Sequence, residues 1–316
     1  MNSIQVIDSN TIHLNLSINS LAFYWSFPEI VAIEYGYYKD EGLDVEIHDV
    51  TPKTKVSNKS EMYMGLQKKG FADAYHAAEW VSITRVVNSP ESRIVAWSPW
   101  LDDALNASFG LYFKPESGIT EPKDLDGKLI VVEGGTGSYY TTIEDLERYI
   151  SRKRIMLKKV GDPNERLVAV WSGEVSAASL LGVYADIATH IGLSKVMDSK
   201  RRKGTLMVAK NDIDAQTLRH FINGTNRAIR TINDNPDEIR RLYFERFKRI
   251  LTRLPDEIMT MGLELKDRIN IPKWSEWQVY PKEEFTESYQ WMVERDMVDY
   301  GYNYENLVDL RAFDGD

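Results

Sequence analysis

The segment Gly134-Gly135-Thr136-Gly137-Ser138 has the composition of an anion-binding turn between a strand and a helix. Its glycines allow backbone N–H groups to approach a ligand, and the N-terminus of the helix that follows favours a negative charge. Thr136 and Ser138 add hydroxyl groups. The Gly-Lys-Ser/Thr ending of a P-loop is absent. The alternative interpretation is a plain turn in which Thr136 or Ser138 caps the helix.

Aromatic side chains gather at other expected turns. The run Phe23–Phe27 (FYWSF) is unusually aromatic for a connection between a strand and a helix. Aromatic faces stack on planar ligands or hold cations, but they also pack in cores. We expect Trp25 and Tyr139 to face a cleft, and Phe23 and Trp97 to lie in the core. The candidate ligand-binding residues are Tyr24, Trp25, Tyr75, His76, Trp80, Gly135, Thr136, Gly137, Ser138 and Tyr139.

His76 is the one histidine of five that lies in an expected cleft turn. An imidazole can act as an acid or a base near neutral pH, and Glu79 is close enough in sequence to pair with it. His76 could equally be a ligand contact or a structural residue, and Glu79 a first-turn acid favoured by the helix dipole. The other histidines show no metal-like spacing, so no metal site is predicted.

Composition narrows the possible classes of function. The 316 residues include 39 Lys and Arg against 48 Asp and Glu, for a net charge of −9, which argues against binding to nucleic acid or to anionic membranes. No apolar run approaches the length of a membrane span. The absence of cysteine excludes disulfides and cysteine nucleophiles. The first ten residues lack a signal-peptide pattern, so we expect a cytoplasmic protein, or an extracytoplasmic one whose signal has been removed.

Short apolar runs alternate with amphipathic stretches up to residue 209, which predicts an α/β fold with mostly parallel sheet. Strands are expected at 11–18, 43–47, 71–75, 93–97, 108–113, 128–132, 155–160, 175–180 and 205–209. Helices are expected at 27–38, 60–69, 79–88, 141–152, 163–171 and 184–191, then at 215–233, 236–248, 255–266 and 282–296. Ligands of such sheets bind beyond the carboxyl ends of strands, which selects the loops at 19–28, 75–80, 133–140 and 180–184.

Four segments share a pattern with one family. They are IEYGYYKDEGLDVEI at 33–47, DLDGKLIVVEGGTGS at 124–138, WSGEVSAASLLGVYADIATHIGLSKVMDS at 171–199, and the stretch 287–310. Together they resemble the type II periplasmic-binding-protein fold of the NMT1/THI5-like and sulfonate/taurine-binding (SsuA-like) family. Two departures are visible, because Ser176 stands where Asp is usual and no proline follows Leu181.

The resemblance implies an α/β protein of two lobes with a ligand cleft between them and a helical C-terminal region. Residues 11–105 would begin lobe 1, residues 106–204 would form lobe 2, and residues 205–316 would complete lobe 1 and add the C-terminal helices. It implies hinge closure around a small organic anion or a planar aromatic or heteroaromatic ligand. The partner would be an ABC permease, and no cofactor is expected.

Enzymes on the same fold leave an alternative open. Aromatic sulfinate desulfinases and fungal-type thiamine pyrimidine synthases resemble this chain in layout, but both use cysteines that it lacks. A cytoplasmic decarboxylase, C–S or C–C lyase, or cofactor-precursor synthase would therefore have to use His76 and Glu79, or Glu133 or a tyrosine. A ligand sensor without catalysis is a third possibility.

Overall fold

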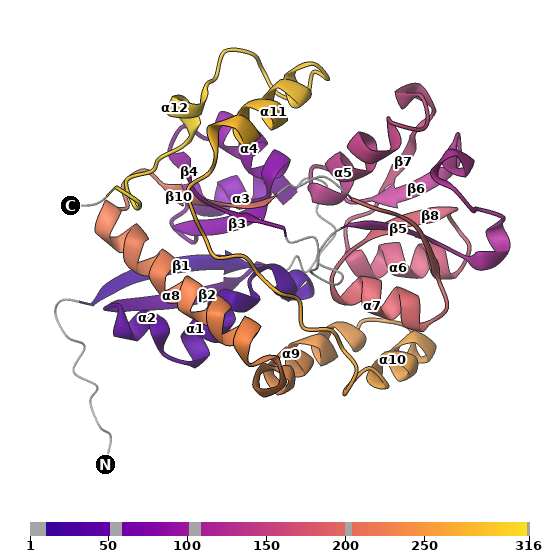
Figure 1. The fold of residues 1–316 in the computed structure, drawn as a ribbon, viewed down its shortest axis with the longest axis horizontal. Coiled ribbons are helices and arrows are strands. Elements are labelled where there is room, and N and C mark those ends of the chain that lie inside the picture. Colours follow the sequence, from indigo (N-terminus) through magenta and orange to yellow (C-terminus); the bar gives the residue numbers. More distant parts are fainter. Residues whose placement is uncertain (1–10, 51–58, 101–108, 200–203, 315–316) are drawn as a thin grey trace.

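The computed structural model describes residues 11–50, 59–100, 109–199 and 204–314, with only the backbone described at 59–63. Two five-stranded sheets lie side by side, each with its own helices (Figure 1). None of the described helices is both long enough and apolar enough to cross a bilayer.

The first sheet has the strand order β2-β1-β3-β10-β4. β1 runs parallel to β2 and β3, whereas β10 is antiparallel to both of its neighbours. The strands are β1 (Ile12–Ile18), β2 (Leu43–Asp49), β3 (Ala74–Ala78), β4 (Ser92–Pro99) and β10 (Gly204–Lys210). The helices between them are η1 (Ser20–Trp25), α1 (Phe27–Glu34), α2 (Tyr37–Asp40), α3 (Lys59–Lys68) and α4 (Glu79–Val87).

The second sheet repeats this plan with the order β7-β6-β8-β5-β9. Here β5 is the antiparallel strand, paired with β8 and β9. The strands are β5 (Gly110–Phe113), β6 (Leu129–Val132), β7 (Met156–Lys159), β8 (Ala177–Leu180) and β9 (Ser194–Asp198). The helices are α5 (Gly137–Leu146), α6 (Pro163–Trp171) and α7 (Val183–His190), with short η2 (Pro115–Ser117), η3 (Pro122–Leu125) and η4 (Arg152–Arg154). The expected mostly parallel α/β architecture is confirmed, with one antiparallel strand in each sheet.

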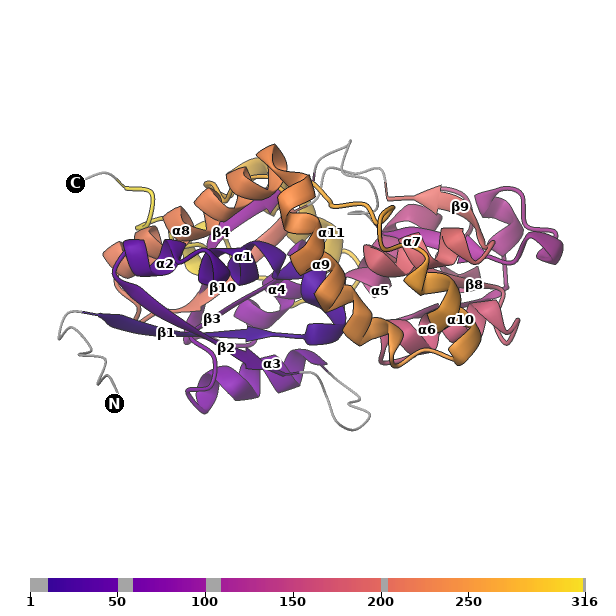
Figure 2. The same cartoon turned by 90° about the horizontal axis from the view of Figure 1, so that it is seen from below.

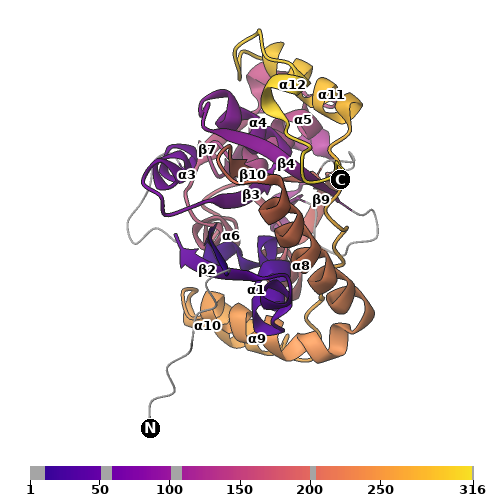
Figure 3. The same ribbon diagram turned by 90° about the vertical axis from the view of Figure 1, so that its left-hand side faces the viewer.

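The C-terminal helices reach both lobes. α8 packs on α1 and α2, and Figure 3 shows α8 beside α1. α10 packs on α7 of the second lobe (Figure 2). Beyond α10, Asn270 Nδ2 donates to Asp186 Oδ1 on α7 at 3.0 Å. These helices are α8 (Ala215–Asp234), α9 (Pro236–Leu251), α10 (Asp256–Leu263), α11 (Lys282–Val293) and α12 (Tyr304–Leu307). The C-terminal region therefore contacts both lobes.

Several element boundaries differ from the sequence-based expectation. The single helix expected at 27–38 is split, because Gly36 adopts a left-handed φ of 76° between α1 and α2. β3 begins at Ala74 rather than residue 71, and Phe71 is 53% exposed before it. α5 begins at Gly137, four residues before the expected start at 141. Gly137 and Ser138 therefore belong to the first turn of the helix and not to the loop before it. β9 is absent from the strands expected from periodicity, although the family pattern at 171–199 implies a strand after Gly192.

Asp73 ties β1 to β10 at one end of the first sheet. Its Oδ2 accepts from the backbone N of Asn15 at 2.7 Å and from Asn15 Nδ2 at 2.8 Å. Its Oδ1 accepts from Lys210 Nζ at 2.7 Å. Burial opposes ionisation of this carboxyl, but Lys210 and Asn15 outweigh burial and hold the pKa of Asp73 below its usual range.

Replacing Asp73 with asparagine is expected to lower the free energy of unfolding by about 1–3 kcal/mol at neutral pH, because a charged acceptor is lost. A lowered carboxyl pKa contributes stability above the pKa of an unfolded aspartate, and this contribution is lost as pH falls through the folded pKa. Urea denaturation near pH 7 and near pH 3 should therefore show a difference between the two proteins that shrinks in acid. A difference that is the same at both pH values would contradict this role.

Candidate ligand-binding cleft

A cleft lies where the carboxyl ends of strands from both sheets meet. The protein atoms around it leave about 710 Å³ of space, open solvent included. Five candidates from the sequence line it: Tyr24, Trp25, His76, Thr136 and Gly137. Other lining residues include Asn19, Ala78, Arg85, Phe109, Glu133, Pro163, Arg166 and Leu181. The cleft thus draws on both lobes.

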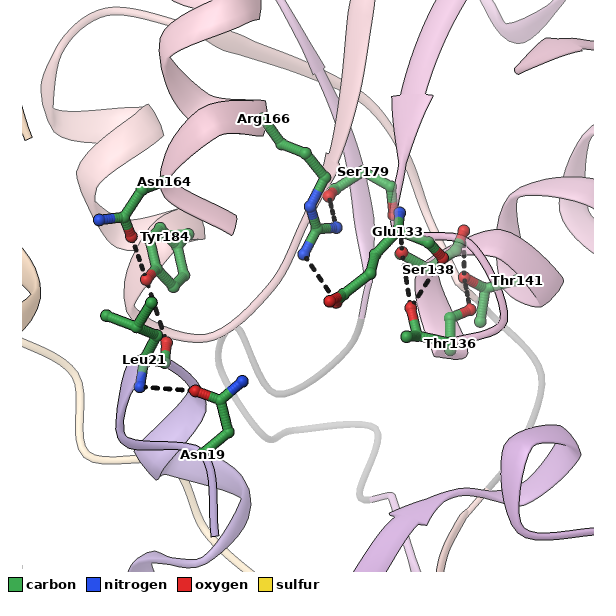
Figure 4. Close-up of polar contacts among 11 residues, drawn as sticks. Asn19, Leu21, Glu133, Thr136, Ser138, Thr141, Asn164, Arg166, Ser179 and Tyr184 are labelled. Carbon is green, nitrogen blue, oxygen red and sulfur yellow. Dashed lines mark hydrogen bonds and ion pairs between the residues drawn. The ribbon is translucent and has the colours of Figure 1, made fainter. Parts of the chain in front are cut away.

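Arg166 of α6 is the central charge of this cleft. The residue is only 1% exposed, and its Nη1 donates to the carbonyl of Ser179 at 2.6 Å. Its Nη2 lies 3.7 Å from Glu133 Oε2, and Nε has no hydrogen-bond partner among the described residues (Figure 4). A buried guanidinium with an unused N–H is suited to bind an anionic oxygen.

Arg85 of α4 supplies a second positive charge from the first lobe. It is 3% exposed, and its guanidinium lies 5.0 Å from the centre of the Tyr75 ring. Glu133 is the only acidic residue among the described residues that line the cleft. Two guanidinium groups against one carboxylate leave the cleft positive, although the chain as a whole carries a charge of −9. This local positive charge favours a negatively charged ligand.

Helix N-termini add to the positive potential. Ala78, Thr136 and Pro163 stand at the starts of α4, α5 and α6, and all three line the cleft. The unpaired N–H groups and the dipole of each helix place partial positive charge there. The convergence of these ends with Arg85 and Arg166 makes one anion-attracting region.

The glycine turn contributes backbone rather than hydroxyl groups. Ser138 Oγ accepts from the backbone N of Glu133 at 2.9 Å, and Thr136 Oγ1 donates to the carbonyl of Glu133 at 2.9 Å. Both hydroxyls therefore close the turn (Figure 4). Thr136 and Gly137 still line the cleft, whereas Gly135 and Ser138 do not.

His76 is paired with a different acid from the one expected. Its Nε2 lies 3.2 Å from Glu29 Oε2, and both side chains are about 1% exposed. Glu79 instead accepts hydrogen bonds from Tyr280 Oη at 2.7 Å and from Ser288 Oγ, inside the first lobe. Glu79 is therefore a structural residue here, and the expected pairing of His76 with Glu79 is not formed.

Three aromatic candidates lie away from the cleft. Trp80 is fully buried and stacks on Tyr140, with ring centres 6.3 Å apart. Tyr75 is fully buried beneath Arg85, and Tyr139 lies near Lys159, whose Nζ is 5.4 Å from its ring centre. Phe23 and Trp97 are buried, as predicted. Tyr24 does line the cleft, and burial raises the pKa of its hydroxyl, which therefore stays protonated.

The two lobes touch directly beside the cleft. Tyr184 Oη of α7 donates to the carbonyl of Leu21 in the first lobe at 3.0 Å (Figure 4). A Cβ on Gly182 would lie 2.9 Å from the Tyr24 ring, and a Cβ on Gly137 would lie 2.9 Å from the Cβ of Ala78. The two lobes are therefore in direct contact at Tyr184, Gly182 and Gly137.

Known structures share this layout. Residues 26–99 match the family model described as NMT1/THI5 like. The alkanesulfonate-binding protein SsuA from Xanthomonas axonopodis pv. citri, solved bound to MOPS, has a TM-score of 0.72 at 11% identity, covering 96% of this chain and 100% of that one. This chain has the periplasmic-binding-protein fold. The match confirms the predicted two-lobed type II fold.

Two further structures show the range of proteins on this periplasmic-binding-protein fold. A zinc-bound ligand-binding component of an ABC-type import system from Staphylococcus aureus has a TM-score of 0.64 at 10% identity, covering 96% of this chain and 98% of that one. The desulfurization enzyme DSZB has a TM-score of 0.57 at 11% identity, covering 95% and 96%. No curated protein matches the sequence. The shared fold thus includes both binding proteins and an enzyme.

Proposed function

We propose that this protein binds a small organic anion and serves as the substrate-binding component of an ABC importer. The observation that carries the proposal is the cleft between the lobes, in which Arg85 and Arg166 outnumber the single acid Glu133. Tyr24 and Trp25 give the same cleft an aromatic wall, which suits a ligand with an apolar or planar body. In this role the protein works outside the cytoplasmic membrane and delivers its ligand to a permease.

The structural neighbours support a binding protein, since SsuA is named for alkanesulfonate binding and the S. aureus protein for ABC-type import. The enzyme alternative has less support. Glu79 is held by Tyr280 and Ser288, so it is not available to act with His76. The chain also has no cysteine nucleophile.

A thermal-shift screen of the purified chain tests the proposal. Aliphatic and aromatic sulfonates, aromatic carboxylates and phosphate esters are each compared with an analogue in which an alcohol replaces the anionic group. A ligand at a hundred times its Kd should stabilise the protein by about 2.7 kcal/mol, and its alcohol should not. Mass spectrometry after overnight incubation should recover the ligand unchanged. Stabilisation by none of the anions, or a ligand that returns chemically altered, would overturn the proposed function.

A further inference from the structure

A second chamber adjoins the anion-attracting cleft. It encloses about 630 Å³ and shares Tyr24, Trp25 and Leu181 with the cleft. Its other walls come from α1, the end of β4 and the chain between α10 and α11. The residues that line only this chamber include Pro28, Glu29, Ser98, Trp100, Gly182, Thr205, Trp274 and Trp277. We call it the indole chamber.

Indole rings dominate these walls. Four tryptophans line the chamber: Trp25, Trp100, Trp274 and Trp277. The rings of Trp25 and Trp100 are 6.0 Å apart and tilted, not stacked face to face. Aromatic faces attract cations. Alkylated ammonium groups suit such faces better than a primary ammonium does, because alkyl groups replace N–H protons that would otherwise need hydrogen-bond acceptors. Such walls provide a cationic group with attraction and apolar contact at once.

Glu29 places a buried negative charge on the same chamber. The residue is 0% exposed, and both carboxylate oxygens lack hydrogen-bond partners among the described residues. Its one ion-pair contact is His76 Nε2 at 3.2 Å, and the N-terminus of α1 further supports a negative charge at this position. A carboxylate with unused acceptor capacity in a low-dielectric site attracts a cation strongly. Lys273, the other charged residue of the lining, is exposed.

We propose that the indole chamber binds an alkylated ammonium group of the ligand, with Glu29 as its counter-charge. This inference rests on the proposed function, because the anionic end of the same molecule occupies the adjoining cleft near Arg85 and Arg166. Trp25 lines both cavities, so the two adjoin at this side chain. The ligand class is then a zwitterion with an anion at one end and a tertiary or quaternary ammonium at the other.

Matched probes test this assignment on the unmodified protein. Trimethylammonio alkanoates are compared by calorimetry with carboxylates of the same chain length that end in a tert-butyl group, in which a carbon atom replaces the charged nitrogen and the carboxylate is kept. Several chain lengths are used so that one spans the two cavities. The zwitterion is expected to bind about tenfold more tightly than its neutral isostere, and more tightly than the primary amino acid of equal length.

A charge-neutral variant provides the second measurement. In Glu29→Gln the preference for the zwitterion should disappear, while the carboxylate with a terminal tert-butyl group keeps its affinity within about threefold. Circular dichroism confirms folding, and if the variant does not fold, the comparison of isosteres on the unmodified chain decides. Equal affinity for both isosteres would overturn the inference and leave the proposed function standing. Binding of none of the anionic probes would overturn both.

Discussion

Replacing Arg166 with methionine should weaken the binding of an anionic ligand by about a hundredfold. Hydrogen bonds to charged groups contribute about 1.5–3 kcal/mol, and the variant removes the buried guanidinium while keeping most of the apolar stem. Isothermal titration with an anion from the thermal-shift screen measures the loss. Arg148→Met is the matched control, because Arg148 lies on the same lobe, is 39% exposed, and does not line the cleft. Its affinity should stay unchanged.

Loss of Arg166 also leaves Glu133 without its cationic neighbour 3.7 Å away. Part of the affinity loss could therefore come from repulsion between Glu133 and the ligand. The double variant Glu133→Gln with Arg166→Met separates these effects, since it removes the repulsion as well as the guanidinium. Compared with Arg166→Met, the double variant should regain free energy of unfolding but little affinity for the ligand. Full affinity in either variant, or equal losses in Arg166→Met and Arg148→Met, would show that Arg166 does not hold the anion.

A single methyl group at Gly137 should prevent full closure of the lobes. In this structure a Cβ there would lie 2.9 Å from the Cβ of Ala78 in the first lobe, and 2.7 Å from the Phe109 ring in its own lobe. Overpacking of this kind costs about 1–3 kcal/mol, which corresponds to about tenfold weaker ligand binding in Gly137→Ala. Small-angle scattering should show a larger radius of gyration in the presence of ligand than for the wild type.

Gly161 provides the control for this prediction. It lies in the same lobe, and a Cβ there would have no neighbour within 4 Å. Gly161→Ala should bind and close like the wild type. The midpoint of thermal unfolding without ligand is measured as well, because Gly137→Ala also crowds the Phe109 ring within its own lobe, and a loss of stability there must be separated from a loss of closure. Wild-type affinity and scattering in Gly137→Ala would mean that the contact between Gly137 and Ala78 is not needed for binding.

Most elements could be predicted because their signals are local. The helices α4, α6 and α8 carry clear amphipathic periodicity. Periodicity does not indicate β9, because SKVMD shows neither alternation nor an apolar run, and its place in the sheet comes from pairing with β5. The early start of α5 was missed because glycine is a poor helix former, although Gly137 lies in the first turn where packing against Phe109 requires it.

The charged residues of the cleft were harder to predict than its turns. Arg85 and Arg166 occupy helices, where a lone arginine usually lies on a solvated face, yet here both are buried. Glu29 looks like an ordinary first-turn acid, and its pairing with His76 depends on contact between elements 47 positions apart, from 29 to 76. Trp80 follows a cleft-facing strand end in sequence but points into the lobe, because a helix turns successive side chains by about 100°. Each of these features depends on tertiary contacts, which the periodicity of the sequence does not encode.

The position of β10 also sets an order of events during synthesis. β3 and β4 do not pair with each other, because β10, which follows the entire second sheet in the chain, lies between them. A nascent chain that ends before Gly204 therefore holds a first sheet with a gap in it, while all strands of the second sheet are already made. Since domains fold as units while the chain emerges, the inserted lobe can fold first. The strands β3 and β4 then keep unpaired edges until β10 is synthesised. β10 begins at Gly204, more than a hundred residues after β3 ends at Ala78. In this interval the chain is most open to aggregation and most in need of a chaperone.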